Sequence, residues 1–144
     1  MDYRVERLRT PTECELFALN AIDRKRPDLA SEARRKAVNL QAAAHGAGSQ
    51  LEAEAFAALY AYETLLTRKN GKKTRATKSW ATIKSHGAIA AIRELVGRVS
   101  EPEVLAGLRD LGLESFAFEA LVLRHETAFD EATVKVSKAR LAPG

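Results

Sequence analysis

The sequence marks where its helices begin and end. Thr10–Glu13 and Ser49–Glu52 are capping boxes, in which a hydroxyl and a carboxylate satisfy the free amides of a helix start. Pro27 stops the first helix, because the residue before a proline is disfavoured in the helical conformation. Gly46 fits the left-handed position that follows a helix, and Asn70-Gly71 is expected to end the third helix. The expected helices cover about 11–25, 28–44 and 50–69, joined by short loops as in an antiparallel three-helix bundle.

Shorter helices are expected in the second half of the chain. Gly87 separates two of them, and a third capping box, Ser100–Glu103, starts another. Residues 113–123 are apolar on almost every side, which is typical of a helix at the centre of a domain. Asp130 can cap the last helix. The expected helices cover about 75–86, 88–96, 100–111, 113–123 and 130–140.

Length and composition favour a single all-α domain. The 144 residues are close to the usual size of one domain. Alanine, a strong helix former, supplies 26 residues, whereas aromatic residues make up only 6% and β-branched residues are scattered, which argues against a sheet. Within this domain we distinguish the N-terminal helical hairpins, 10–70, from a basic loop–helix segment and the C-terminal helices, 71–141.

Charge is distributed very unevenly along the chain. Between Thr64 and Arg93 there are eight basic residues and no acidic one, with Glu63 and Glu94 as the flanking acids. The net charge of the chain is +4, so the residues outside this window carry −4. Such a layout concentrates the electric field at one place and attracts a polyanion. We therefore expect a nucleic acid, DNA or RNA, to bind there.

Helical spacing sorts the side chains of the basic segment, residues 68–84. Trp80 and Ile83 share the face expected to pack, while the opposite face carries cations and hydroxyls of the kind that donate to phosphate oxygens. Thr74 is expected to cap this helix and to bring its N-terminus beside the basic loop. The expected nucleic-acid ligands are Arg68, Lys69, Lys72, Lys73, Arg75, Lys78, Ser79, Thr82, Lys84 and, just beyond the segment, His86.

Other interpretations stay open. The basic segment can be a solvated surface, and residues 75–96 loosely resemble a helix-turn-helix whose second helix offers only Arg93 and Glu94 for reading bases. Phe56 and Tyr60 lie off the main apolar face of their helix, so the hairpins could form a groove for a protein partner or a homodimer seam. A small phosphorylated ligand is a further alternative. An acidic lipid fits least, because the basic helix lacks a large aliphatic face.

No set of residues specifies catalysis, a metal or a cofactor. His45, His86 and His125 lie in separate segments, without a second ligand at metal-binding spacing. Cys14 lies on the apolar face of its helix, which is typical of a small core residue. The sequence has no Gly-rich phosphate motif and no nucleophile elbow. We therefore expect a non-catalytic protein that uses no cofactor.

The sequence also bears on location. The N-terminus lacks the apolar stretch of a secretory signal, and no apolar run approaches the length of a membrane span. The single cysteine excludes an internal disulfide. We expect a cytoplasmic protein without a membrane partner, and the frequent use of alanine and arginine favours a bacterial source.

Overall fold

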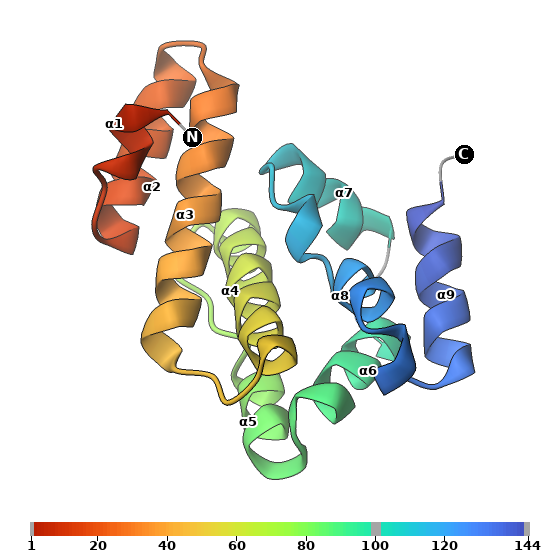
Figure 1. Ribbon diagram of the computed structural model, residues 1–144. Helices are drawn as coiled ribbons and strands as arrows, with labels where there is room; N and C mark the ends of the chain where they lie inside the picture. The colour runs from red at the N-terminus through yellow and green to blue at the C-terminus, as the bar shows by residue number, and fades with distance from the viewer. Residues whose placement is uncertain (1, 99–101, 143–144) are drawn as a thin grey trace.

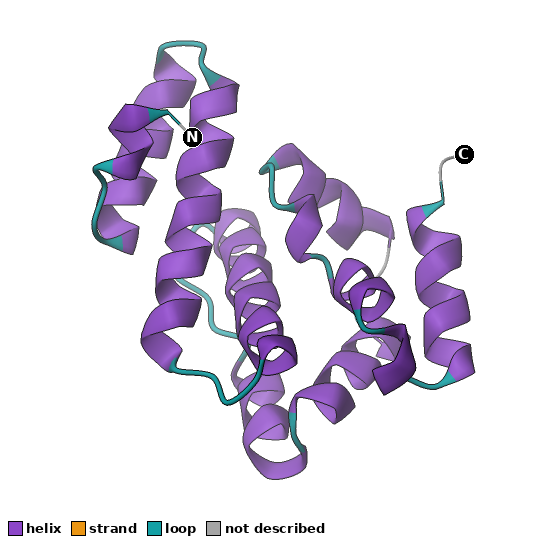
Figure 2. Cartoon of the chain, viewed as in Figure 1, coloured by secondary structure: helices purple, strands orange, loops and turns teal. Residues whose placement is uncertain are grey.

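The computed structural model describes residues 2–98 and 102–142. These residues form helices and turns without a strand (Figure 2), so the expected all-α fold is confirmed. The helices are α1 (Tyr3–Glu6), α2 (Pro11–Asp23), α3 (Pro27–His45), α4 (Gln50–Asn70), α5 (Thr77–His86), α6 (Ala88–Arg98), α7 (Pro102–Asp110), α8 (Phe118–Arg124) and α9 (Glu131–Leu141), with 3-10 turns η1 (Glu114–Phe116) and η2 (Glu126–Ala128).

The first long helices are antiparallel, as expected. Helix α3 lies between α2 and α4 and packs against both (Figure 1). The hydroxyl half of both capping boxes forms as the sequence predicts, because the Thr10 hydroxyl accepts a hydrogen bond from the Glu13 amide and the Ser49 hydroxyl accepts one from the Glu52 amide, each at 3.1 Å. The carboxylate half differs, because Glu52 accepts from the Gly48 amide at 2.9 Å and Glu13 contacts the Thr10 hydroxyl at 3.4 Å. Gly71 ends α4 in the left-handed conformation, with φ of 72°.

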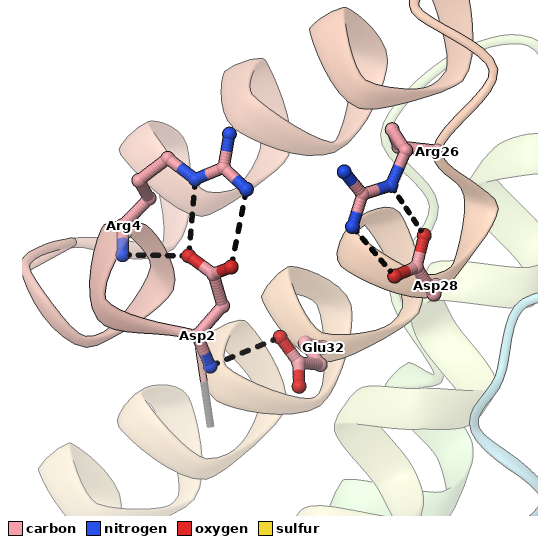
Figure 3. A network of polar contacts seen from close by, with 5 residues as sticks. All are labelled: Asp2, Arg4, Arg26, Asp28 and Glu32. Carbon is pink, nitrogen blue, oxygen red and sulfur yellow. Dashed lines mark hydrogen bonds and ion pairs between the residues drawn. The ribbon is translucent and has the colours of Figure 1, made fainter.

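The short helix α1 was not among the expected helices, and polar contacts hold it against α3. The Asp2 carboxylate caps α1 and also accepts hydrogen bonds from the Arg4 guanidinium at 3.1 Å (Figure 3). These bonds lower the pKa of Asp2 to about 2. The Asp2 amide reaches Glu32 of α3 at 3.4 Å, and the Lys36 ammonium donates to the Val5 carbonyl at 2.9 Å. Helix α1 is therefore held along α3.

Helix α8 lies at the centre of the C-terminal half, where it contacts α4, α6 and α9 (Figure 1). Its Phe118, Leu121 and Val122 are almost completely buried, as expected for this apolar stretch. The stretch is not one continuous helix, however, because Ala117 is extended, with ψ of 146°, and separates η1 from α8. The capping box expected at Ser100 lies outside the described residues.

The buried side chains of the described residues form three clusters. The first joins α4, α6 and α8, and the second joins α3, α4 and α7. The third lies between α2 and α3 and consists mainly of small residues. Helix α5 contains no fully buried residue, but its half-buried Trp80 and Ile83 pack against both the first and the second cluster. These two side chains therefore attach α5 to the body of the protein.

Candidate nucleic-acid interface

The chain turns back after α4 and runs alongside it before α5 begins (Figure 1). The Thr74 amide donates to the Thr67 hydroxyl at 2.9 Å, and one turn lower the Ala76 amide donates to the Glu63 carboxylate at 2.8 Å. The Trp80 indole nitrogen reaches the same carboxylate at 2.7 Å. The basic segment therefore extends from the C-terminal end of α4 back along that helix.

Glu63 fixes the geometry of this segment. Its side chain is buried, and its Oε2 atom accepts hydrogen bonds from the Ala76 amide, the Trp80 indole and the Arg75 guanidinium, the last at 3.1 Å. The Arg75 side chain stays 55% exposed, so it both anchors the segment and reaches solvent. In the sequence, Glu63 appears only as the boundary of the acid-free window; its role depends on contacts across 12 to 17 residues.

An aromatic cluster surrounds Trp80. The His45 ring is stacked on the indole, with the ring centres 4.7 Å apart and an angle of 14° between the planes. The ring centres of Phe56 and Tyr60 lie 5.8 and 5.0 Å from that of the indole. His45 Nδ1 lies 3.2 Å from the Tyr60 hydroxyl. Trp80 is thus a packing residue, as the sequence predicts. His45, at the C-terminal end of α3, covers one side of it.

The expected cations are exposed and lie along the segment. Two of them lie in the last turn of α4, two lie in the loop, and two lie on α5: Arg68 and Lys69, Lys72 and Lys73, and Lys78 and Lys84, respectively. In the described part of the chain none of these residues forms an ion pair, unlike Arg75. The exposed cations without an ion pair are Arg68, Lys69, Lys72, Lys73, Lys78 and Lys84.

The start of α5 differs from the expectation. Ala76, not Thr74, occupies the N-cap position, and no side chain caps it. Thr74 instead closes the loop, because its hydroxyl donates to the Lys72 carbonyl at 2.9 Å and accepts from the side-chain amide of Asn70 at 3.0 Å. The start of α5 is consequently not a capped helix terminus, and the hydrogen bonds of Thr74 lie within the loop and with α4.

The hydroxyls of α5 also differ from the expectation. Thr82 donates its hydrogen to the Lys78 carbonyl at 3.0 Å, and Ser85 donates its hydrogen to the Ala81 carbonyl at 2.9 Å. A hydroxyl has only one hydrogen, so in this conformation both oxygens can act only as acceptors toward a ligand. Ser79 and Thr82 are half-buried, although we expected both to be exposed. Thr82 therefore does not offer phosphate the donor that the sequence indicated.

A groove between α5 and α6 extends the exposed face. The α5 side of the groove includes Lys78 and His86. On the other side α6 contributes Arg93, which we had not included among the ligands, and the carboxylate of Glu94. Only the three-dimensional arrangement brings these α6 side chains opposite α5, because they lie 15 or more residues beyond Lys78. The complete lining is Lys78, Ala81, Thr82, Ser85, His86, Ala90, Arg93 and Glu94.

A further cation lies near the loop end of the segment. Arg34 of α3 donates to the Leu111 carbonyl at 3.5 Å, and burial, followed by the nearby charge of Arg68, lowers its pKa. The sequence contains no local signal for this proximity, because it depends on the packing of α3 beside α4. Arg34 therefore adds positive charge next to the C-terminal end of α4.

The other candidate residues point to structural roles. Cys14 is fully buried, and burial raises the pKa of its thiol, which disfavours a nucleophile. His125 lies 2.6 Å from the Glu54 carboxylate and connects α8 to α4. Phe56 is buried and Tyr60 half-buried, which weakens the protein-binding groove considered above. Among the described residues no group of three or more His, Cys, Asp or Glu side chains could hold a metal.

None of the described helices has the length and apolar character needed to cross a membrane. No family model, curated protein or solved structure matches this chain.

Proposed function

We propose that this protein is a non-catalytic nucleic-acid-binding protein, or an accessory domain of one, that contacts phosphates through the basic segment 68–84. The observation that carries the proposal is the set of exposed cations along α4, the loop and α5, none of which is neutralised by a described acidic residue. Phosphate contacts of this kind supply most of the affinity of non-specific nucleic-acid binding.

The arrangement of these cations supports an extended ligand over a single small anion. The basic residues follow the chain back along α4 and continue onto α5. The opposite face of α5 packs against the core through Trp80 and Ile83. Glu63 orders this segment and forms an ion pair with Arg75, and no described acidic residue pairs with the other six cations. A polyanion with regularly spaced phosphates matches such a series of charges. We include a cytoplasmic, bacterial setting in this proposal; the free thiol of Cys14 is compatible with a reducing compartment.

The test is the salt dependence of binding. Each phosphate contact contributes about −0.9 to the slope of log K against log salt on duplex DNA, and about −0.7 on a single strand. Replacing both Lys72 and Lys73 with Gln should therefore reduce the magnitude of the slope by about 1.4 to 1.8. A matched variant, Lys25→Gln with Lys135→Gln, removes two exposed lysines outside the segment and should leave the slope unchanged. Absence of binding to duplex DNA and to single-stranded RNA at low salt would refute the proposal.

One observation favours a second function, protein–protein interaction through α2. Leu16, Leu19 and Ile22 are 59%, 58% and 44% exposed and recur every third residue, so they form an apolar stripe facing away from α3. This stripe differs in position from the Phe56 and Tyr60 surface expected from the sequence. Light scattering over a range of concentrations would test self-association, and Leu19→Gln should abolish any assembly that uses the stripe. A mass that stays monomeric at all concentrations would leave only a different protein as partner.

A further inference from the structure

The groove between α5 and α6 has the size of a ligand site. Its volume of about 430 Å³ falls within the range of small-molecule pockets, roughly 300 to 1,000 Å³. A single phosphate group would fill only part of it. Ala81 and Ala90 lie on opposite helices of the groove, and their small side chains leave room for a ligand to approach the backbone of both.

The middle of the groove presents hydrogen-bond acceptors. Thr82 and Ser85 use their hydroxyl hydrogens on backbone carbonyls, which leaves two lone pairs on the Thr82 oxygen and, beside the contact with His86, one on the Ser85 oxygen for a donor. Ser85 Oγ also lies 2.8 Å from His86 Nδ1. Because the Ser85 hydrogen is already used, this contact requires Nδ1 to carry the hydrogen, and neutral His86 then presents Nε2 as a further acceptor.

The charged side chains of the groove have mixed sign. Lys78 and Arg93 can hold a phosphate, one from each helix. Glu94 repels a phosphate but accepts hydrogen bonds from hydroxyl groups. A ligand that matches the whole lining therefore combines a phosphate with hydroxyl donors. In nucleic acids the sugar of RNA supplies such a donor through its 2′-hydroxyl, whereas the sugar of DNA has none within the chain.

We propose that the α5–α6 groove binds a ribose–phosphate unit, with the phosphate between Lys78 and Arg93 and the 2′-hydroxyl donating to Thr82, Ser85 or Glu94, so that the protein selects RNA over DNA. This inference rests on the proposed nucleic-acid function and specifies its substrate class. The basic segment supplies sequence-independent and sugar-independent affinity, and the groove adds the preference for ribose.

The experiment compares three single-stranded oligonucleotides of identical base sequence, with RNA, 2′-O-methyl RNA or deoxyribose backbones, by fluorescence anisotropy at one ionic strength. The wild-type protein should bind RNA about two- to tenfold more tightly than DNA for each hydroxyl hydrogen bond formed. The 2′-O-methyl strand, which has lost the donor, should bind like DNA. Two variants remove acceptors: Thr82→Val keeps the shape of the side chain, and Ser85→Ala adds a strong helix former at an exposed position of α5.

Both variants should weaken the binding of RNA and so bring the ratio of RNA to DNA affinity toward one. Lys84→Gln is the matched control, because Lys84 lies on α5 outside the groove; it should weaken both ligands alike and preserve the ratio. Equal affinity of the wild type for RNA and DNA, or a ratio unchanged in both variants, would overturn the ribose site and leave the proposed function intact. Absence of binding to every strand at low salt would overturn both.

Discussion

Replacing Glu63 with Ala should destabilise the protein more than any change among the exposed cations. The Glu63 carboxylate is the common acceptor for Arg75, Ala76 and Trp80, and it is 7% exposed. Truncation of Glu63 removes the acceptor of these three hydrogen bonds. Because α5 has no fully buried residue, the loss also weakens one of the few attachments of α5 to the body of the protein.

The magnitude follows from the surroundings of the three donors. The Ala76 residue is buried and Trp80 half-buried, and a stranded donor of this kind costs about 1 to 3 kcal/mol. Arg75 is more than half exposed, so water replaces its partner at little cost. The expected loss is therefore about 2 to 6 kcal/mol, from the two stranded donors. With a slope of about 1.5 kcal/mol per molar urea, a loss of about 3 kcal/mol lowers the unfolding midpoint by about 2 M.

Urea unfolding followed by tryptophan fluorescence measures this loss directly, because Trp80 is the single tryptophan of the chain and donates a hydrogen bond to Glu63. Glu63→Gln is the matched control: its amide oxygen can still accept from Ala76 and Trp80, so it should lose less than half as much. An unchanged midpoint for Glu63→Ala would show that the carboxylate does not hold the basic segment, and the account of its orientation would fail.

Three other outcomes are expected. Cys14→Ser should lose about 1 to 3 kcal/mol in chemical denaturation, because it buries an unpaired hydroxyl, whereas nucleic-acid binding by the folded protein should not change. Burial raises the pKa of Glu54, but hydrogen bonds, first of all from His125, lower it more, so the pKa in the folded protein lies below the unfolded value near 4.5. The ionised Glu54 therefore stabilises the protein above pH 4.5, and this contribution is lost as the pH falls through the folded pKa. Below about pH 4.5, unfolding free energies should therefore fall more steeply for the wild type than for Glu54→Gln. Gly112→Ala should lower the thermal midpoint strongly, because φ is +74° and the added Cβ would lie 2.3 Å from the Ser31 side chain.

The elements that sequence patterns predicted are those with local causes. The caps at Thr10, Ser49 and Asp130 form within one turn of helix, so the neighbouring residues are sufficient to identify them. Ala117 interrupts the expected helix over 113–123, and the apolar pattern alone could not reveal that interruption. Pattern identifies which stretch is buried more reliably than whether that stretch is one helix.

The charge of the candidate site could be predicted from the sequence, but its hydrogen bonds and its contacts between helices could not. Exposure of Lys72 and Lys78 follows from composition and helical spacing. The carboxylate that orders this segment, Glu63, is distant along the chain from its hydrogen-bond partners. The Thr82 hydroxyl donates to the Lys78 carbonyl, and no sequence pattern specifies that bond. Arg93 joins the groove only because α6 folds back beside α5.

The cluster between α2 and α3 implies that stability is uneven across the molecule. Four of its six buried residues are alanines, which remove little apolar area from water. Native-state hydrogen exchange should consequently show the amides of α2 opening at a lower free energy than those of α8, as a separate cooperative unit. Helices α4 and α6 contribute to the other clusters, and Trp80 and Ile83 of α5 pack against them, so a molecule with α2 transiently released would keep its basic segment ordered.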